Sequence, residues 1–223
     1  MSHSRRVILL RHGRTAWNAE RRFQGQADPP LDEVGRAQAY EVAALIAALR
    51  PEQLVSSDAI RALQTAEVVG EVAALHVVKE PRLRERGLGH WEGLTREEVA
   101  ERYPDEFSDW VAGLDVSRRG GETREQVAER AIAAFAELPE VPTTVLVTHS
   151  ATAMALTNGL LGIAQAVHPL GPLANCHWSE LYAEPVVGGA TAWRLRGHNL
   201  GVPGTVVPLP ARLDADDASD ADA

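Results

Sequence analysis

Two histidines, each directly after a short run of apolar or β-branched residues, are the first candidates for chemistry in this sequence. One lies in Arg11-His12-Gly13, and the other is His149. A neutral imidazole can attack an electrophile or transfer a proton, and a guanidinium offers a planar set of donors to a phosphate. Glycine lets the backbone approach a ligand closely. The pattern therefore indicates an anion-binding site, although an isolated Arg-His pair is more often a surface charge beside a structural histidine.

The surrounding residues place both histidines at the ends of expected strands. Apolar or β-branched runs predict strands at residues 7–10, 53–56, 76–78 and 143–148. Helical patterns alternate with these runs and cover residues 32–49, 57–72, 95–102, 104–113, 122–138 and 151–161, with a loop at 81–93. Ser57 and Asp58 are expected to cap the second of these helices. Two alternating stretches, at 177–183 and 192–196, predict an antiparallel pair at a sheet edge.

Strands that alternate with helices predict an α/β fold of three layers, α/β/α, with a mostly parallel central sheet and an antiparallel edge. In such sheets ligands bind beyond the carboxyl ends of the strands, which is where both histidines are expected. No internal linker divides the chain, so we expect one domain over residues 1–212. Residues 213–223 contain five aspartates and no basic residue, which predicts a disordered acidic tail.

Composition excludes several classes of protein. The 223 residues are 45% hydrophobic and 24% charged, as in ordinary globular proteins. A formal net charge of −9 argues against partners such as nucleic acid or an anionic membrane. The single cysteine, Cys176, cannot form a disulfide within the chain, and no apolar run is long enough for a signal peptide or a membrane span. We therefore expect a cytoplasmic protein.

Five motifs, in order along residues 7–161, resemble those of the histidine phosphatase superfamily, also called phosphoglycerate mutase-like. The motifs are Leu10-Arg11-His12-Gly13-Arg14-Thr15 with Asn18 and Gln24-Gly25; Ser56-Ser57-Asp58 with Arg61-Ala62 and Gln64-Thr65-Ala66; Leu83-Arg84-Glu85 with Gly89 and Trp91-Glu92-Gly93; Gly120-Gly121-Glu122; and Val147-Thr148-His149. This resemblance implies the phosphoglycerate mutase-like version of the α/β fold expected above.

The resemblance also implies a role for each matching residue. His12 is expected to be the nucleophile that forms a phosphohistidine, which divides one difficult displacement into two. Arg11, Arg61 and His149 are expected to form the phosphate pocket and to neutralise charge on the transferring group. Because these side chains do the work of a cation, no metal ion and no cofactor is implied. Further contacts to phosphate are expected from Thr15, Asn18, Gln24, Gly25 and Ser150.

Glu85 matches the family position that protonates the leaving oxygen and then activates the incoming water. Glu92 and Asp58 are weaker candidates for this role, and a solvated loop charge is the alternative interpretation of Glu85. Two residues near the motifs have less support. His90 is expected to line the mouth of the site, and Glu122 to start a helix and to contact the substrate.

The resemblance leaves the acceptor of the phosphoryl group open, since water makes a phosphatase and a second hydroxyl makes a mutase. Only 26 residues separate Gly93 from Gly120, fewer than we expect of the cofactor-dependent phosphoglycerate mutases. After His149 the chain continues with Ser150, where those mutases have a Gly-Asn-Ser sequence. We therefore expect a phosphatase of a small phosphorylated metabolite, with the mutase as the alternative.

The segment from Gly171 to Asn175, with Trp178, is similar to that of small phosphatases that act on glucosyl-3-phosphoglycerate. A phosphatase of broad specificity for phosphosugars or phosphoacids is the alternative. An alternative of another class is an inert phosphoester-binding or regulatory module, against which the complete set of motif residues argues. The apolar segment after residue 168, which contains tryptophan, is compatible with a homodimer.

Overall fold

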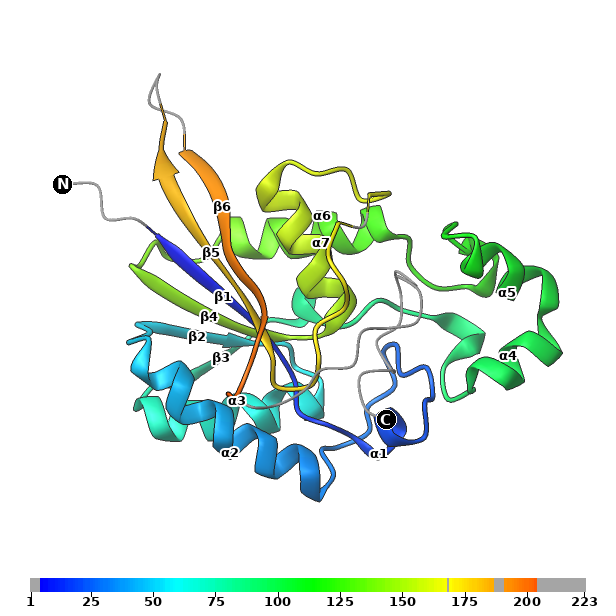
Figure 1. Ribbon diagram of the computed structural model, residues 1–223, viewed down its shortest axis with the longest axis horizontal. Helices are drawn as coiled ribbons and strands as arrows, with labels where there is room; N and C mark the ends of the chain where they lie inside the picture. The colour runs from blue at the N-terminus through cyan, green and yellow to red at the C-terminus, as the bar shows by residue number, and fades with distance from the viewer. Residues whose placement is uncertain (1–4, 168, 187–190, 204–223) are drawn as a thin grey trace.

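A six-stranded sheet forms the centre of the molecule in a computed structural model that describes residues 5–167, 169–186 and 191–203 (Figure 1). The strands lie in the order β3-β2-β4-β1-β5-β6. Their bounds are β1 Arg6–Arg11, β2 Gln53–Ser56, β3 Val77–Lys79, β4 Thr143–Thr148, β5 Trp178–Pro185 and β6 Thr191–Leu200. The first four strands of this order are parallel, whereas β5 and β6 pair antiparallel. The predicted mixed sheet with an antiparallel edge is therefore confirmed.

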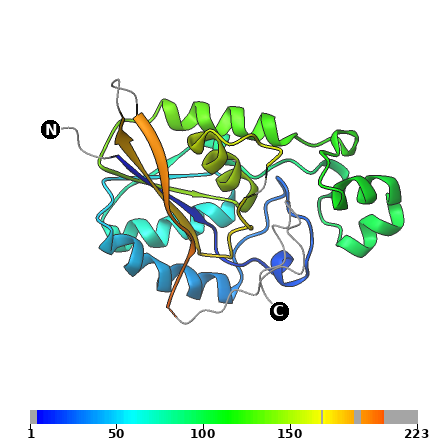
Figure 2. The same ribbon diagram turned by 45° about the horizontal axis from the view of Figure 1, so that its top comes forward.

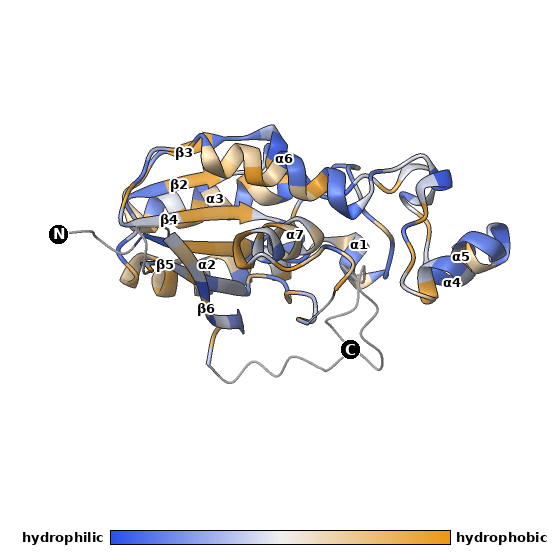
Figure 3. Ribbon diagram, turned by 90° about the horizontal axis from the view of Figure 1, so that it is seen from above, coloured by the Kyte–Doolittle hydropathy of each residue, from blue (hydrophilic) through white to orange (hydrophobic). Residues whose placement is uncertain are grey.

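Helices cover both faces of this sheet, because alternate residues of a strand point to opposite sides. Ile8 and Leu10 of β1 join the cluster that includes α2 (Glu33–Ala48) and α3 (Ile60–Ala73). Val7 and Leu9 join the cluster on the other face, with α6 (Arg124–Ala136) and α7 (Ser150–Leu161). Figure 2 shows α2 and α6 on opposite sides of the sheet. In Figure 3, seen from above, β4 is coloured as hydrophobic along much of its length, as a strand buried on both faces should be.

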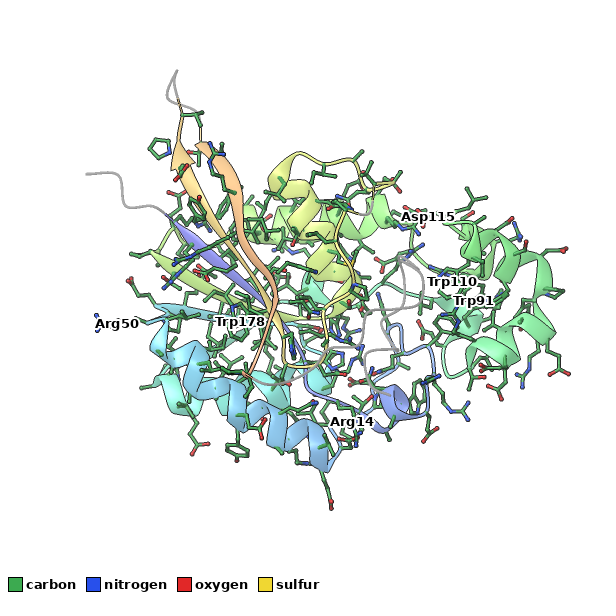
Figure 4. The ribbon with its side chains drawn as sticks, in the orientation of Figure 1. Arg14, Arg50, Trp91, Trp110, Asp115 and Trp178 are labelled. Atoms are coloured by element: carbon green, nitrogen blue, oxygen red, sulfur yellow. The ribbon has the colours of Figure 1, made fainter. Side chains whose placement is uncertain are left out.

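Two short helices, α4 (Arg96–Arg102) and α5 (Pro104–Val111), project to one side of this body (Figure 1). Together with their connections they form a lobe, residues 88–119, which we call the cap. The cap has a small apolar core of its own, made by Phe23, Leu88, Trp91, Val99, Trp110 and Val116. Trp91 and Trp110 lie together there (Figure 4), with their ring centroids 6.1 Å apart. Phe23 reaches this core from the segment that follows β1, so it joins the cap to the rest of the domain.

Two expectations about local structure are wrong. Ser57 and Asp58 do not cap α3, whose N-cap is Ala59. The amide of Ile60 instead donates to the carboxylate of Asp28 across 2.7 Å. The expected loop at 81–93 contains two short 3₁₀ helices, η1 (Pro81–Leu83) and η2 (Gly89–Trp91).

One helix was not expected from the sequence, α1 (Ala16–Ala19). The predicted acidic tail, residues 213–223, lies outside the described residues. No helix in the described part of the chain combines the length and the apolar character that a bilayer crossing requires.

Candidate active site

His12 lies directly after β1 and is almost completely buried. Its Nδ1 is 2.7 Å from the carbonyl oxygen of Gly13, so Nδ1 carries the proton and donates it. The Nε2 atom accepts a hydrogen bond from the Nε of Arg61 at 3.2 Å. Burial, together with the charges of Arg61 and Arg11, lowers the pKa of His12 well below its ordinary value. The ring is therefore neutral at neutral pH, with the lone pair of Nε2 facing the pocket that contains the guanidinium.

Arg61 and Arg11 are two buried cations whose charges both act on His12. Arg61, from the first turn of α3, donates to the carbonyl oxygens of Ala27 at 2.6 Å and Gly25 at 2.9 Å. Burial lowers its pKa to about 10, which leaves the guanidinium charged at neutral pH. Arg11 donates to the carbonyl of Leu173 across 2.5 Å. Buried charges are costly unless an opposite charge compensates them, so this arrangement favours an anionic ligand.

The second motif histidine, His149, meets His12 because β1 and β4 are adjacent parallel strands. Arg11 pairs with Thr148 in the register, and the two rings that follow lie edge to face with centroids 5.1 Å apart. The Nε2 of His149 is 2.9 Å from the hydroxyl of Ser57, and its Nδ1 has no hydrogen-bond partner among the described residues. Burial, and then the charge of Arg61, lowers the pKa of His149 well below its ordinary value. A second neutral imidazole therefore lies against that of His12, although His149 itself does not line the pocket beside them.

Glu85 approaches the same pocket from the opposite side, at the N-terminus of α7. Its carboxylate accepts hydrogen bonds from the backbone amides of Thr152 at 3.2 Å, Ala151 at 3.3 Å and Arg86 at 2.8 Å. The free amides at a helix N-terminus favour a negative charge and hold it in place. Glu85 is thus buried, oriented and directed at the site, unlike a solvated loop charge.

The two weaker candidates for the proton donor have other partners. One carboxylate oxygen of Glu92 accepts hydrogen bonds from the backbone amides of Gln26 at 3.0 Å and Leu88 at 2.9 Å. Asp58 forms a bidentate ion pair with Arg84, at 2.6 and 2.7 Å. Neither residue lines the pocket that contains His12. The geometry therefore favours Glu85 among the three acidic side chains.

A pocket that opens to solvent lies beside His12, Arg61 and Glu85. Its lining residues are His12, Arg22, Phe23, Gln24, Gly25, Arg61, Glu85, Arg86, Leu88 and Ala151. Gln24 and Gly25 thus line the same pocket as His12. In the described part of the chain no cluster of three or more His, Cys, Asp or Glu side chains has a spacing that could hold a metal ion.

Three further predicted residues are buried beside the pocket and bond within the protein. Thr15 is the N-cap of α1 and forms a capping box with Asn18. The hydroxyl of Ser150 accepts the amide of Leu173 at 3.2 Å. These bonds shape the loops around the two histidines.

The two candidates with less support lie farther out. His90 is in the cap, where its Nε2 is 2.9 Å from a carboxylate oxygen of Glu106. Its ring lies against that of Tyr103 at a tilt of 42°. Glu122 forms an ion pair with Arg130 at 2.7 Å. Neither His90 nor Glu122 is among the residues that line the pocket.

The sequence motifs did not point to several residues that the structure places here. Asn175 is buried, and its amide donates to the carbonyl of His12 at 3.1 Å. Phe23, Leu88 and Arg86 line the pocket. Phe23 and Arg86 are direct neighbours in sequence of the motif residues Gln24 and Glu85, a signal that could have identified them.

Comparisons with known proteins agree with this geometry. Curated relatives include the glucosyl-3-phosphoglycerate phosphatase of Mycolicibacterium vanbaalenii, which is 36% identical over 96% of this chain and 95% of that protein. The enzyme of the same name from Mycobacterium tuberculosis is 36% identical over 86% of this chain and 93% of its own length. A probable phosphoglycerate mutase GpmB of Cronobacter sakazakii is 34% identical over 84% of this chain and 89% of that protein.

Among solved structures, the native mycobacterial glucosyl-3-phosphoglycerate phosphatase superposes with a TM-score of 0.79 at 37% identity, and covers 88% of this chain and 99% of that one. The family model described as histidine phosphatase superfamily (branch 1) matches residues 7–196, a range that contains every motif described above. The chain therefore belongs to the histidine phosphatase superfamily.

Proposed function

We propose that the protein hydrolyses a phosphomonoester through a phosphohistidine formed at Nε2 of His12, without a metal ion. The observation that carries this proposal is the 3.2 Å hydrogen bond from the Nε of Arg61 to that nitrogen. It identifies Nε2 as the atom with the lone pair and places a fixed cation beside it. A phosphate that binds the guanidinium therefore meets a neutral nucleophile.

In the first step the Nε2 of His12 attacks phosphorus and the bond from phosphorus to the leaving oxygen breaks. Glu85 gives its proton to that oxygen, so the alcohol leaves neutral. Positive charge develops on the imidazole, and the carbonyl of Gly13 stabilises it by accepting the Nδ1 proton in a hydrogen bond. Arg11 and Arg61 neutralise the charge on the transferring oxygens, and the neutral ring of His149 donates a hydrogen bond to them.

In the second step a water molecule occupies the position of the departed alcohol. Glu85, now ionised, takes a proton from this water while the oxygen attacks phosphorus. The bond from phosphorus to Nε2 breaks, which releases inorganic phosphate and returns His12 to its neutral form. The amides of Ala151 and Thr152, at the N-terminus of α7, hold the carboxylate in place for this step.

For the substrate we propose a small phosphorylated metabolite, specifically glucosyl-3-phosphoglycerate. Two mycobacterial relatives with this activity in their names cover 86–96% of the chain at 36% identity. Buried cations and apolar groups such as Phe23 and Leu88 line the same pocket, a combination that suits a phosphate attached to a larger organic group. A phosphoglycerate mutase is the second candidate, because relatives with that probable activity in their names are 32–34% identical.

The mechanism is tested with p-nitrophenyl phosphate in buffer that contains a chelator. We expect the wild-type protein to release phosphate and His12→Ala to lose this activity, with the exposed His76→Ala as the matched control. A phosphoenzyme that is labile in acid and stable in base should form in the wild type and in His76→Ala, but not in His12→Ala. Activity of His12→Ala comparable to that of the wild type would overturn the proposal.

The substrate is tested by comparing kcat/KM for glucosyl-3-phosphoglycerate with the values for 3-phosphoglycerate and several sugar phosphates. We expect the first compound to have the highest value. Interconversion of 3- and 2-phosphoglycerate that depends on the bisphosphate would instead establish the mutase.

We further propose that residues 1–212 form one catalytic domain with an acidic tail, and that the protein works in the cytoplasm as a homodimer. The net charge of −9 and the single cysteine support a cytoplasmic protein without nucleic acid or membrane partners. Burial of Cys176 raises the pKa of its thiol, which keeps it protonated and unreactive. Light scattering on the purified protein measures the oligomeric state, and a monomer at all concentrations would contradict the dimer.

A further inference from the structure

A short segment around Glu85, residues 82–87, connects β3 to the cap, and we call it the acid loop. Arg130 of α6 binds three backbone carbonyls of this loop. Its Nη1 donates to the oxygens of Arg82 at 2.6 Å and Arg84 at 2.7 Å, and its Nη2 donates to the oxygen of Glu85 at 3.0 Å. The side chain is 18% exposed, so these bonds are partly shielded from solvent.

Glu122 holds the guanidinium of Arg130 in position. One carboxylate oxygen of Glu122 accepts a hydrogen bond from the Nε of Arg130 at 2.7 Å, and the other accepts one from its Nη2 at 2.9 Å. The second oxygen also accepts a hydrogen bond from the backbone amide of Gly87 at 2.8 Å. Burial raises the pKa of Glu122, but the bonds from Arg130 and Gly87 outweigh it and leave the pKa lowered. The adjacent Gly121 allows this approach, since a Cβ atom there would lie 2.0 Å from the carbonyl oxygen of Gly87.

The opposite side of the acid loop is fastened to the catalytic end of the sheet. The hydroxyl of Thr148 donates a hydrogen bond to the carbonyl oxygen of Leu83 at 2.7 Å. The hydroxyl of Thr152 donates one to the carbonyl oxygen of Arg84, also at 2.7 Å. All four carbonyls from residue 82 to residue 85 therefore accept a side-chain hydrogen bond. Arg130 supplies three of these bonds from a single planar group, which a lysine ammonium cannot reproduce.

From this arrangement we propose that Arg130, held by Glu122, is the positioning residue that sets the distance from the carboxyl of Glu85 to the leaving oxygen. The inference rests on the proton-donor role proposed above for Glu85. Proton transfer requires heavy atoms within hydrogen-bond reach, and displacement of a catalytic group by about 1 Å costs about 100-fold in rate. A relaxed acid loop should leave the phosphate pocket in place, because among the described residues Arg130 forms no hydrogen bond to His12, Arg11, Arg61 or His149.

This role has a chemical signature that a general loss of stability does not share. Nitrophenolate is a good leaving group and departs without a proton, whereas an alkoxide needs one from Glu85. We expect Arg130→Gln to lower kcat/KM for an alkyl phosphate by about 100-fold, and for p-nitrophenyl phosphate by less than about tenfold. The parameter kcat/KM is the right one, because it covers only the steps up to formation of the phosphoenzyme.

The experiment compares the ratio of these two kcat/KM values in the wild type and five variants, using the best alkyl phosphate substrate of the wild type. The variants are Arg130→Gln, Arg130→Lys, Glu85→Gln, the double variant of Arg130→Gln and Glu85→Gln, and the control Arg6→Gln. Arg6 is similarly buried, 23% exposed, and it also binds a backbone carbonyl and a glutamate, but at the far end of β1. Circular dichroism checks that each variant is folded.

We expect a selective loss on the alkyl phosphate in Glu85→Gln and both Arg130 variants, a wild-type ratio in Arg6→Gln, and no further selectivity in the double variant. If Glu85→Gln loses both activities equally, the proton-donor assignment itself fails. If Glu85→Gln is selective but the Arg130 variants lose both activities equally, the positioning role is overturned. Should Arg130→Gln not fold, Arg130→Lys decides, since it keeps the charge beside Glu122 without the planar group.

Discussion

The Nε of Arg61 donates a hydrogen bond to the Nε2 of His12 across 3.2 Å, with both side chains almost completely buried. A cation that donates to the ring excludes a proton from Nε2, so the bond and the burial both keep the imidazole neutral. The same guanidinium is anchored by the carbonyls of Gly25 and Ala27. The position of Arg61 is therefore set before any phosphate binds, which lowers the cost of reorganisation during the reaction.

Replacement of this guanidinium should impair catalysis even if the charge is kept. We expect Arg61→Lys to lower kcat/KM for p-nitrophenyl phosphate by about 10²–10³-fold, because lysine lacks the planar donors that bind His12, the loop and phosphate together. Arg50→Lys is the control, since Arg50 lies on the opposite side of the molecule from Trp91 (Figure 4) and should retain wild-type activity. A loss below about fivefold in Arg61→Lys would contradict this role.

The two buried histidines should make the protein less stable in mild acid. Their folded pKa values are lowered, so below about pH 6.5 the unfolded chain binds protons that the folded chain does not. The free energy of unfolding therefore falls as the pH drops through that range. We expect His149→Gln to reduce this slope by up to about 1.4 kcal/mol per pH unit, the value for one proton. Urea unfolding between pH 5 and 8 measures it, and identical slopes would show that His149 does not contribute.

The N-terminus of α3 should depend on a side chain that is distant in sequence. Asp28→Ala removes the acceptor for the amide of Ile60, and we expect a loss of about 1 kcal/mol in the free energy of unfolding, as for other helix caps. Asp28→Asn keeps an oxygen acceptor and should lose less than half of this amount. Equal losses in the two variants, measured by urea unfolding, would indicate that charge rather than capping is responsible.

The cap should unfold locally without its central tryptophan. Trp91 is completely buried in the cap core, so Trp91→Ala is expected to remove about 3–5 kcal/mol of packing there. Hydrogen exchange should accelerate in α4 and α5 while the amides of β4 stay protected, because the two cores are separate. Trp193→Ala, on the sheet edge, is the control and should leave exchange in the cap unchanged. Faster exchange throughout the protein in Trp91→Ala would contradict a separate cap core.

The central strands were the most predictable elements. The expected strands at 53–56 and 143–148 agree with β2 and β4 at both ends. A strand that is covered on both faces is apolar along its whole length, and this signal is present in the local sequence. For most helices, the predicted first and last residues lie within two residues of those in the structure. The reason is similar, since each helix has one apolar face and a clear stop.

Capping and the choice among acidic residues were not predictable in this way. Asp28 caps a helix that begins at Ile60, whereas Ser57 and Asp58 stand beside that helix in sequence and do not cap it. Glu92 matched the same motif as Glu85, but its carboxylate accepts hydrogen bonds from backbone amides of the loops. Contacts of this kind depend on how distant segments approach one another, and local patterns carry no information on that.

The sequence by itself determined the type and order of the elements and the family motifs that contain His12, Arg61, Glu85 and His149. The tertiary structure alone decided that the two histidine rings meet across adjacent strands and that α7 presents its free amides to Glu85. It also decided that Arg130 binds the acid loop. The physical reason is that side-chain periodicity follows from burial of each element, whereas these contacts follow from strand order and register, which are set only when the whole sheet assembles.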